Sequence, residues 1–472
     1  MKKFVAAIAL AAFCAACSPG ENEVRDTSVT EDTQELTAET VVGDWSGQLS
    51  VPGGPELWLV FHITEADEEG GLAITMDSPD QGAMGIAGEN ASVEDGTFQA
   101  SFPVIGARFT MTPGDGEEMK GAWIQGLPMP FALTRGNNVP ARARPQEPQT
   151  RDYVVETVSF PGGADDVELA GELTLPAGDG PFPALVLISG SGPQDRNEEL
   201  MGHRPFLVLS DHLTRSGYAV LRYDDRGFSE STGDYASATT RDFADDAAAA
   251  LAYLKADARI DAARTAYVGH SEGGLVAPMA TQVEPAAALV LLAGPAVPLS
   301  DVLLRQTADI MRVEGASEED IETALAVNQS AFDIARAGNE DADALEAEMK
   351  AAFVSSGVNE TMAENMSERM TGPWMAWIMD YDPVPALEAY DGPVLALFGS
   401  MDVQVAPDAS EGIMREALSH PDSDVVTLDG LNHLFQPAET GAMSEYLEIE
   451  TTMDPAALEA VSDWLDDALG AG

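Results

Sequence analysis

One serine lies in a glycine-rich stretch, Val268-Gly269-His270-Ser271-Glu272-Gly273-Gly274, between an apolar run that predicts a buried strand and a small-residue segment that predicts a helix. Gly-x-Ser-x-Gly in this context is typical of a nucleophile elbow, a tight turn that exposes the serine hydroxyl at a helix N-terminus. The flanking glycines are expected because a Cβ there would clash where strand and helix pack. The stretch therefore predicts that Ser271 is a nucleophile.

A serine nucleophile needs a general base, and the base needs an acid that orients it. In a fold of alternating strands and helices, the acid and then the histidine follow the serine, each after a strand. Asp402 follows the predicted strand 394–398, and His433 follows the predicted strand 425–428. Asp429 is the rival acid, but it lies in the same loop as His433 and precedes a glycine turn. We therefore predict a triad of Ser271, Asp402 and His433.

The five other histidines are poorer candidates for the base. His270 lies inside the elbow, and its side chain is expected to point away from that of Ser271. A histidine alone in an apolar strand, as at His62, is more often structural than catalytic. The others lie at the start or on the face of a predicted helix, or precede a proline: His203, His212 and His420.

The negative oxygen of a tetrahedral intermediate needs backbone N–H donors. The first predicted donor is Glu272, which directly follows the nucleophile. The second belongs to the loop 189–196 after the third predicted strand of the α/β region, whose glycines let the main chain approach an oxyanion. Ser191 is the expected donor and Gly192 the next choice, and Gly192 is also assigned to the substrate pocket.

Another polar loop, Asp224-Asp225-Arg226-Gly227, follows the fourth predicted strand of the same region. Paired arginine and aspartate side chains in loops mostly serve as supports. We therefore interpret this loop as a structural tie around the site.

The composition excludes two classes of partner. The chain has 472 residues, 80 of them acidic and 24 basic, with a net charge of −56 and only five lysines. Such a surface repels nucleic acid and anionic lipid headgroups, so neither is an expected partner. Strong acidity also suits a protein that works in salt, where screening reduces self-repulsion.

The N-terminal segment is predicted to be a signal peptide over residues 1–17. A basic pair precedes the apolar run 4–13, which is too short to span a bilayer. Small residues before Cys17 resemble a bacterial lipobox, so Cys17 is a candidate lipidation site and membrane anchor, with ordinary signal cleavage as the alternative. The protein is expected to be exported, as a periplasmic or membrane-anchored lipoprotein. The acidic segment 18–40 is interpreted as a flexible tether.

Both cysteines of the chain, Cys14 and Cys17, lie in this N-terminal segment. The mature protein therefore has no expected disulfide and no cysteine-based metal site. Neither a metal nor another cofactor is predicted.

Two patterns follow the tether. Residues 41–135 show short alternating runs separated by Gly, Asp and Pro turns, which predicts a small antiparallel all-β domain. Residues 136–150 are rich in Pro and Arg and predict a semi-rigid linker.

From residue 151 to 472 continuous Val, Leu and Ile runs alternate with helices, which predicts a parallel sheet covered on both faces. The alternation stops over 298–385, a helical, acidic, Met-rich segment that we interpret as a lid. Trp374 and Trp377 of this segment could form an apolar wall of the substrate pocket. Ordinary packing within the lid is the equally weighted alternative.

Five stretches resemble a known superfamily: Ser-Gly-Ser-Gly-Pro-Gln-Asp-Arg-Asn-Glu, Tyr-Asp-Asp-Arg-Gly, Gly-His-Ser-Glu-Gly-Gly, Gly-Ser-Met-Asp-Val-Gln-Val and Gly-Leu-Asn-His-Leu-Phe-Gln. Together they resemble the α/β-hydrolases, and more narrowly the bacterial serine carboxylesterases grouped beside the serine aminopeptidases. The resemblance covers Tyr153 to Leu469. The β-rich front domain is similar, less closely, to one that some of these esterases carry.

The resemblance implies an α/β-hydrolase fold and ester hydrolysis through an acyl-enzyme, without metal or cofactor. Aminopeptidases, thioesterases and lactone hydrolases share these motifs and remain alternatives. A non-catalytic carrier of carbohydrate or lipid ranks third, because it would not need an intact triad.

An aminopeptidase would also need acidic residues to hold the α-ammonium group of its substrate. Asp195 and Glu198 are the nearest candidates, and Arg196 between them is expected to offset their charge. We therefore predict a small-molecule ester as the substrate.

Overall fold

The computed structural model describes residues 36–50, 56–66, 71–81, 83–125, 127–140, 142–338 and 341–470. The predicted signal peptide with Cys17, and the tether up to residue 35, lie outside the described residues. The chain forms two compact units, one built mainly from residues up to Arg142 and the other mainly from residues after it.

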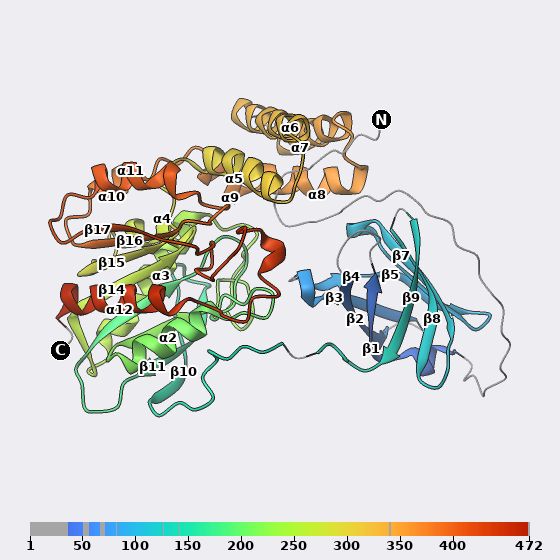
Figure 1. Ribbon diagram of the computed structural model, residues 1–472, viewed down its shortest axis with the longest axis horizontal. Helices are drawn as coiled ribbons and strands as arrows, with labels where there is room; N and C mark the ends of the chain where they lie inside the picture. The colour runs from blue at the N-terminus through green and yellow to red at the C-terminus, as the bar shows by residue number, and fades with distance from the viewer. Residues whose placement is uncertain are drawn as a thin grey trace. The chain divides into compact units, whose positions relative to one another are not determined.

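The first unit contains a nine-stranded antiparallel sheet in the order β4-β3-β2-β1-β9-β8-β7-β6-β5 (Figure 1). Strands that follow one another in sequence pair with each other except β4 and β5, which lie at the two ends of this order. In addition, β1 pairs with β9, which brings the two ends of the chain segment together. The strands are β1 (Gly43–Ser50), β2 (Glu56–Glu65), β3 (Leu72–Ser78), β4 (Ala83–Ala87), β5 (Glu89–Glu94), β6 (Thr97–Phe102), β7 (Ala107–Pro113), β8 (Glu118–Gln125) and β9 (Leu127–Arg135).

An aromatic core holds this sheet together. Phe61 is fully buried and packs edge-on against Phe109, with ring centroids 5.2 Å apart. Trp123 stacks on Phe102 at 5.9 Å. Alternate residues of each strand supply these side chains, as the period-two pattern predicts.

Two sequence-based expectations for this unit need correction. The tether was expected to reach residue 40, but Leu36 is buried and Ala38–Val41 forms helix α1. His62 is not alone, because its two ring nitrogens each lie 2.8 Å from a carboxylate, one of Asp44 and one of Asp77. The hydrogen bond to Asp77 is the main reason why the pKa of His62 is raised, so this histidine ties two strands to β2.

The second unit is built on an eight-stranded sheet in the order β10-β11-β13-β12-β14-β15-β16-β17. The first three strands of this order pair antiparallel, and all later neighbours pair parallel. The strands are β10 (Val154–Pro161), β11 (Glu168–Leu175), β12 (Phe182–Ile188), β13 (Ala219–Tyr223), β14 (Ile260–His270), β15 (Ala288–Leu292), β16 (Val394–Gly399) and β17 (Asp424–Leu428).

Helices cover both faces of this sheet (Figure 1). Helices α2 (Pro205–Arg215) and α12 (Pro455–Leu469) pack on one face. Helices α3 (Thr240–Ala256), α4 (Gly273–Ala280), α10 (Val384–Glu388) and α11 (Pro407–Ala417) pack on the other.

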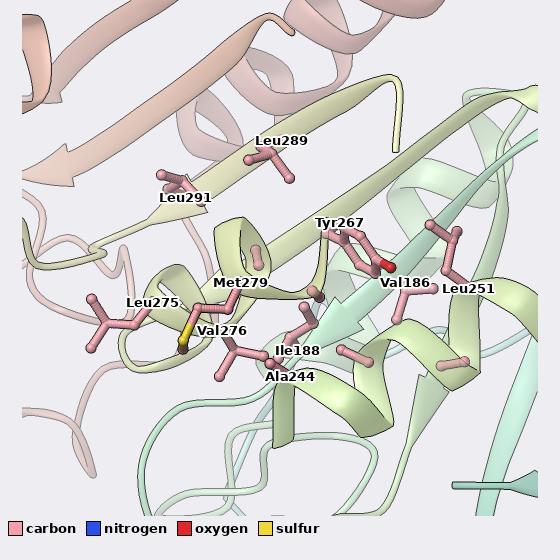
Figure 2. Close-up of a cluster of buried hydrophobic side chains, with 14 of the residues drawn as sticks. Val186, Ile188, Ala244, Leu251, Tyr267, Leu275, Val276, Met279, Leu289 and Leu291 are labelled. Carbon is pink, nitrogen blue, oxygen red and sulfur yellow. The ribbon is translucent and has the colours of Figure 1, made fainter. Parts of the chain in front are cut away.

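Successive residues of the central strands alternate between the two faces. Val186 and Ile188 of β12 face α3 and α4, whereas Leu185 and Leu187 face α2 and α12. Figure 2 shows the first of these layers, with Val276 of α4 packed near Ile188. All these side chains are buried, which explains the continuous apolar runs in the sequence.

A helical insertion separates β15 from β16. It contains α5 (Leu299–Val313), α6 (Glu318–Ala337), α7 (Ala342–Ser355), α8 (Glu360–Thr371), α9 (Pro373–Ile378) and, at its end, α10. The predicted helical segment 298–385 corresponds to this insertion.

Candidate active site

Ser271 lies between strand β14 and helix α4 with a backbone φ of +53°. Left-handed backbone is costly for a residue with a Cβ and is typical of strained functional positions. The Ser271 N–H donates to the carbonyl of Leu292 at the end of β15, over 2.8 Å. The elbow is therefore anchored to the neighbouring strand while its side chain stays partly exposed.

The glycines around Ser271 are required by close backbone contacts. A Cβ at Gly269 would lie 2.0 Å from the carbonyl oxygen of Gly273, and one at Gly273 would lie 2.3 Å from that of Ile188. A Cβ at Gly274 would lie 2.6 Å from the Cα of Gly294. The expectation that strand and helix pack too tightly for side chains is confirmed.

Asp402 and His433 lie together at the carboxyl ends of β16 and β17. The His433 Nδ1 is 2.8 Å from the Asp402 Oδ2, and both side chains are buried. The other carboxylate oxygen of Asp402 accepts the N–H groups of Gln404 and Val405, at 2.8 and 2.9 Å. Asp429 instead accepts a hydrogen bond from the Ser400 hydroxyl on the surface.

The predicted triad also requires a hydrogen bond between Ser271 and His433. Within the described part of the chain, no hydrogen bond joins the Ser271 Oγ to the His433 Nε2, and neither atom has another partner. Catalytic hydrogen bonds are often long without substrate and shorten in the reacting complex. The elbow places Ser271 on the same sheet edge as the Asp402–His433 pair.

The predicted oxyanion loop, residues 189–196, follows β12 and passes beside Ser271. A Cβ at Gly190 would lie 3.2 Å from the Cβ of Ser271. The Gly190 N–H donates to Glu198, and the Gln194 N–H donates to Asp225.

Two backbone N–H groups beside Ser271 remain available. Among the described residues, no hydrogen-bond acceptor is found for the N–H of Ser191 or for that of Glu272. The N–H of Gly192 faces the hydroxyl of Tyr235, which makes Gly192 the weaker of the two predicted loop donors.

The Glu272 side chain joins the elbow to the helical insertion. It is buried, and its Oε1 accepts the Thr240 hydroxyl at 2.6 Å and the Trp374 Nε1–H at 2.8 Å. Burial raises the pKa of the Glu272 carboxyl, and these two hydrogen bonds oppose that shift. Trp374 therefore contacts the residue next to the nucleophile, whereas Trp377 stacks on Tyr381 with centroids 4.8 Å apart.

A small cavity lies beside the oxyanion loop. Its lining includes Ser189, Gly190, Asp225 and Glu272. It is comparable in size to one water molecule, which such a polar site could hold.

Loop 224–227 acts as the predicted structural tie, but its partners come from other segments. Arg196 binds Asp224 through its Nη2 at 2.5 Å and does not offset Asp195 and Glu198 as expected. Asp225 accepts the Ser189 hydroxyl at 2.8 Å, and Arg226 pairs with Asp246 of α3 at 2.6 Å. The tie therefore fixes the oxyanion loop and α3 together.

Three other histidines have structural partners. His203 is fully buried between the Thr452 hydroxyl and the Tyr446 carbonyl, and His212 contacts the Ser462 hydroxyl. His270 contacts Glu198 and the main chain of His433, as described below. Sequence reasoning missed the Glu198 contact, because the two residues are 72 positions apart and share no motif.

Within the described ranges, no group of three or more His, Cys, Asp or Glu side chains could hold a metal ion. No helix of that part of the chain is long and apolar enough to cross a membrane.

The strand order of the second unit, its antiparallel second strand and the serine elbow after its fifth strand define the α/β-hydrolase fold. Residues 205–439 also match the family model described as serine aminopeptidase, S33. The second unit therefore has the α/β-hydrolase fold, and the residues that match this family model make up just under half of the chain.

This chain is similar to Esterase EstD of Thermotoga maritima, with 27% identity over 298 residues. The alignment covers 63% of this chain and 65% of the relative, so about a third of the relative has no counterpart in it.

Solved structures similar to this chain include a thermophilic esterase from Thermogutta terrifontis, with 19% identity and a TM-score of 0.40. That alignment covers 66% of this chain and 99% of the other. An esterase of Pyrococcus furiosus aligns with 15% identity and a TM-score of 0.42, over 70% of this chain and 99% of the other. The fold assignment rests on the strand order, which is independent of these alignments.

Proposed function

We propose that this hydrolase cleaves carboxylic esters of small molecules through an acyl-enzyme. The observation that carries the proposal is the buried Asp402–His433 pair at the sheet edge where the elbow presents Ser271. The similarity to an esterase supports the same reading.

In the proposed reaction, the Ser271 Oγ attacks the ester carbonyl carbon while the His433 Nε2 takes the hydroxyl proton. The N–H groups of Glu272 and Ser191 stabilise the oxygen that becomes negative. His433 then gives its proton to the leaving alkoxide, and Asp402 stabilises the imidazolium that exists between these steps. A water molecule, activated by His433, hydrolyses the acyl-enzyme and restores the Ser271 hydroxyl.

An aminopeptidase is the second candidate, because the matched family model carries that description. Such an enzyme needs a carboxylate free to hold an ammonium group. Glu198 is buried against His270, and Asp195 accepts hydrogen bonds from Asn197 and Glu199 within its own loop. Since both carboxylates have partners, the site favours esters over aminoacyl amides.

The test compares wild type with Ser271→Ala on p-nitrophenyl esters and on unblocked aminoacyl-anilides of similar size. We expect the substitution to lower ester turnover by at least ~10⁴-fold without loss of folding. A fluorophosphonate should label the wild type once and leave the variant unlabelled. Persistent labelling of the variant would remove Ser271 from its role, and equal kcat/KM for the anilide and the ester would favour the aminopeptidase.

A further inference from the structure

A second histidine–carboxylate pair lies beside the predicted catalytic pair. The His270 Nδ1 is 2.8 Å from the Glu198 Oε1, the same separation as between His433 and Asp402. The side chains of His270 and Glu198 are only 7% and 6% exposed. The imidazole rings of His270 and His433 lie against each other, with centroids 4.7 Å apart.

The partners of His270 indicate that both of its ring nitrogens carry a proton. The Nε2 lies 3.0 Å from the backbone carbonyl of His433, which can only accept a hydrogen bond. The Nδ1 faces the Glu198 Oε1, which already accepts the Gly190 N–H at 2.8 Å. An oxygen that accepts two N–H groups is best ionised, so the pair consists of an imidazolium and a carboxylate.

This pair connects three of the segments that meet at Ser271. His270 directly precedes the nucleophile in the chain. Its Nε2 holds the main chain of His433, and Glu198 holds Gly190, whose backbone packs on the Ser271 side chain.

The elbow, the histidine loop and the oxyanion loop therefore share one buried ion pair. We propose that the His270–Glu198 pair is a positioning element of the active site: His270, as an imidazolium, fixes the His433 loop, and Glu198 fixes the oxyanion loop. The inference rests on the proposed function, because it assigns roles within the same site.

Three further features support this assignment. The backbone of Glu198 has a φ of +53°, a strained conformation that persists only where the surroundings enforce it. Burial by itself would lower the pKa of His270, but the charge and hydrogen bond of Glu198 together raise it. The charge of Asp402 also raises this pKa.

His270 is not a second general base, because its Nε2 is committed to a carbonyl. By contrast, the His433 Nε2 has no partner among the described residues and is free to take a proton. The two histidines thus have similar carboxylate partners and different tasks.

The protonation state is tested first, without any substrate. Selective ¹⁵N labelling of the six histidines resolves the ring nitrogens by NMR, and His270→Gln assigns the His270 signals. We expect both nitrogens of His270 to be protonated at pH 7 to 8. A neutral His270 at pH 7 would overturn the inference, even if the protein proves to be an esterase.

The positioning role is tested with Glu198→Gln, which keeps an oxygen acceptor and removes the charge. We expect kcat for a p-nitrophenyl ester to fall about 10- to 100-fold, with KM within about twofold, because misplaced catalytic groups slow chemistry rather than binding. The matched control is Glu199→Gln in the same loop, whose carboxylate pairs with Arg204 on the surface. The control should keep wild-type kcat.

Wild-type kcat in Glu198→Gln would overturn the positioning role. If Glu198→Gln fails to fold, His270→Gln replaces it with the same expected loss. If the wild type hydrolyses no ester, the proposed substrate is wrong, and the rate of fluorophosphonate labelling at Ser271 replaces kcat. An equal labelling rate in wild type and Glu198→Gln would then overturn the inference by itself.

Discussion

At the scale of single residues, the backbone holds Ser271, the proposed nucleophile, in a strained conformation. Its left-handed conformation costs of order 1–3 kcal/mol, and the surrounding contacts hold it there. The N–H bond to Leu292 and the close approach of Gly269 to Gly273 leave little room for relaxation. Asp402 is held differently, since both of its carboxylate oxygens already have donors.

The proposed orienting role of Asp402 gives a prediction that separates it from Asp429. Asp402→Asn should lower kcat/KM for an ester by about 10³–10⁴-fold, because an amide would hold His433 in the wrong tautomer. Asp429→Asn serves as the control and should change the rate little, because the hydrogen bond found for its carboxylate among the described residues is with Ser400 and not with His433. Steady-state kinetics of both variants decides, and the reverse ranking would move the acid to Asp429.

At the scale of elements, the proposed active site depends on segments that lie far apart in sequence and meet at one edge of the sheet. The helical insertion contributes Trp374 of α9, which binds Glu272 of the elbow. His203 lies in the segment just before α2. Its ring contacts the Thr452 hydroxyl and the Tyr446 carbonyl, both in the segment before α12. These contacts are polar and buried, so each is sensitive to the loss of one partner.

His203 gives a pH prediction for this second contact. Burial lowers the pKa of His203 to about 4, from an ordinary value of 6.5. Well above pH 6.5 the residue is neutral in both the folded and the unfolded state. As the pH falls from 6.5 to 4, His203 takes up a proton in the unfolded chain but stays neutral in the folded chain. The free energy of unfolding should therefore drop by up to roughly 3 kcal/mol.

Urea unfolding at several pH values between 7 and 4 measures this loss. Acidic groups contribute their own pH dependence, so the comparison is with His203→Gln, which cannot take up the proton. The variant should be less stable at pH 7 and should lose less stability on acidification. Parallel pH curves for the two proteins would contradict the prediction.

At the scale of the whole molecule, the charge is the dominant property. With 80 acidic and 24 basic residues, most carboxylates cannot find a basic partner. Several arginines already form ion pairs with two carboxylates each, as Arg259 does with Glu156 and Asp257. Self-repulsion therefore opposes the folded state at low ionic strength.

Salt should relieve this repulsion. When NaCl is raised from about 20 mM to about 1 M, the Debye length shortens to about 3 Å. We expect the Tm to rise by at least ~5 °C as a result. Thermal unfolding followed by circular dichroism measures the shift. KCl at equal concentration is the control, since screening depends on ionic strength and not on the cation. A Tm that is constant with salt would contradict the prediction.

The sequence by itself was sufficient for the α/β fold, for the all-β front unit and for the positions of Ser271, Asp402 and His433 at strand ends. Each of these follows from local pattern. Burial imposes continuous apolar runs or alternation on strands, and the elbow demands glycines within a few residues of the serine. Such constraints act between neighbours in the chain, so they are visible without the structure.

Only the tertiary structure decided which polar side chains meet. The contacts of His270 with Glu198 and of Trp374 with Glu272 join residues 72 and 102 positions apart in the chain. Arg196 forms an ion pair with Asp224 rather than with the acidic residues next to it in the sequence. A charged side chain in a loop has the same pattern whether it is solvated or paired. Its partner is set by where the sheet brings separate loops together, and by the cost of burying a polar group without a hydrogen bond.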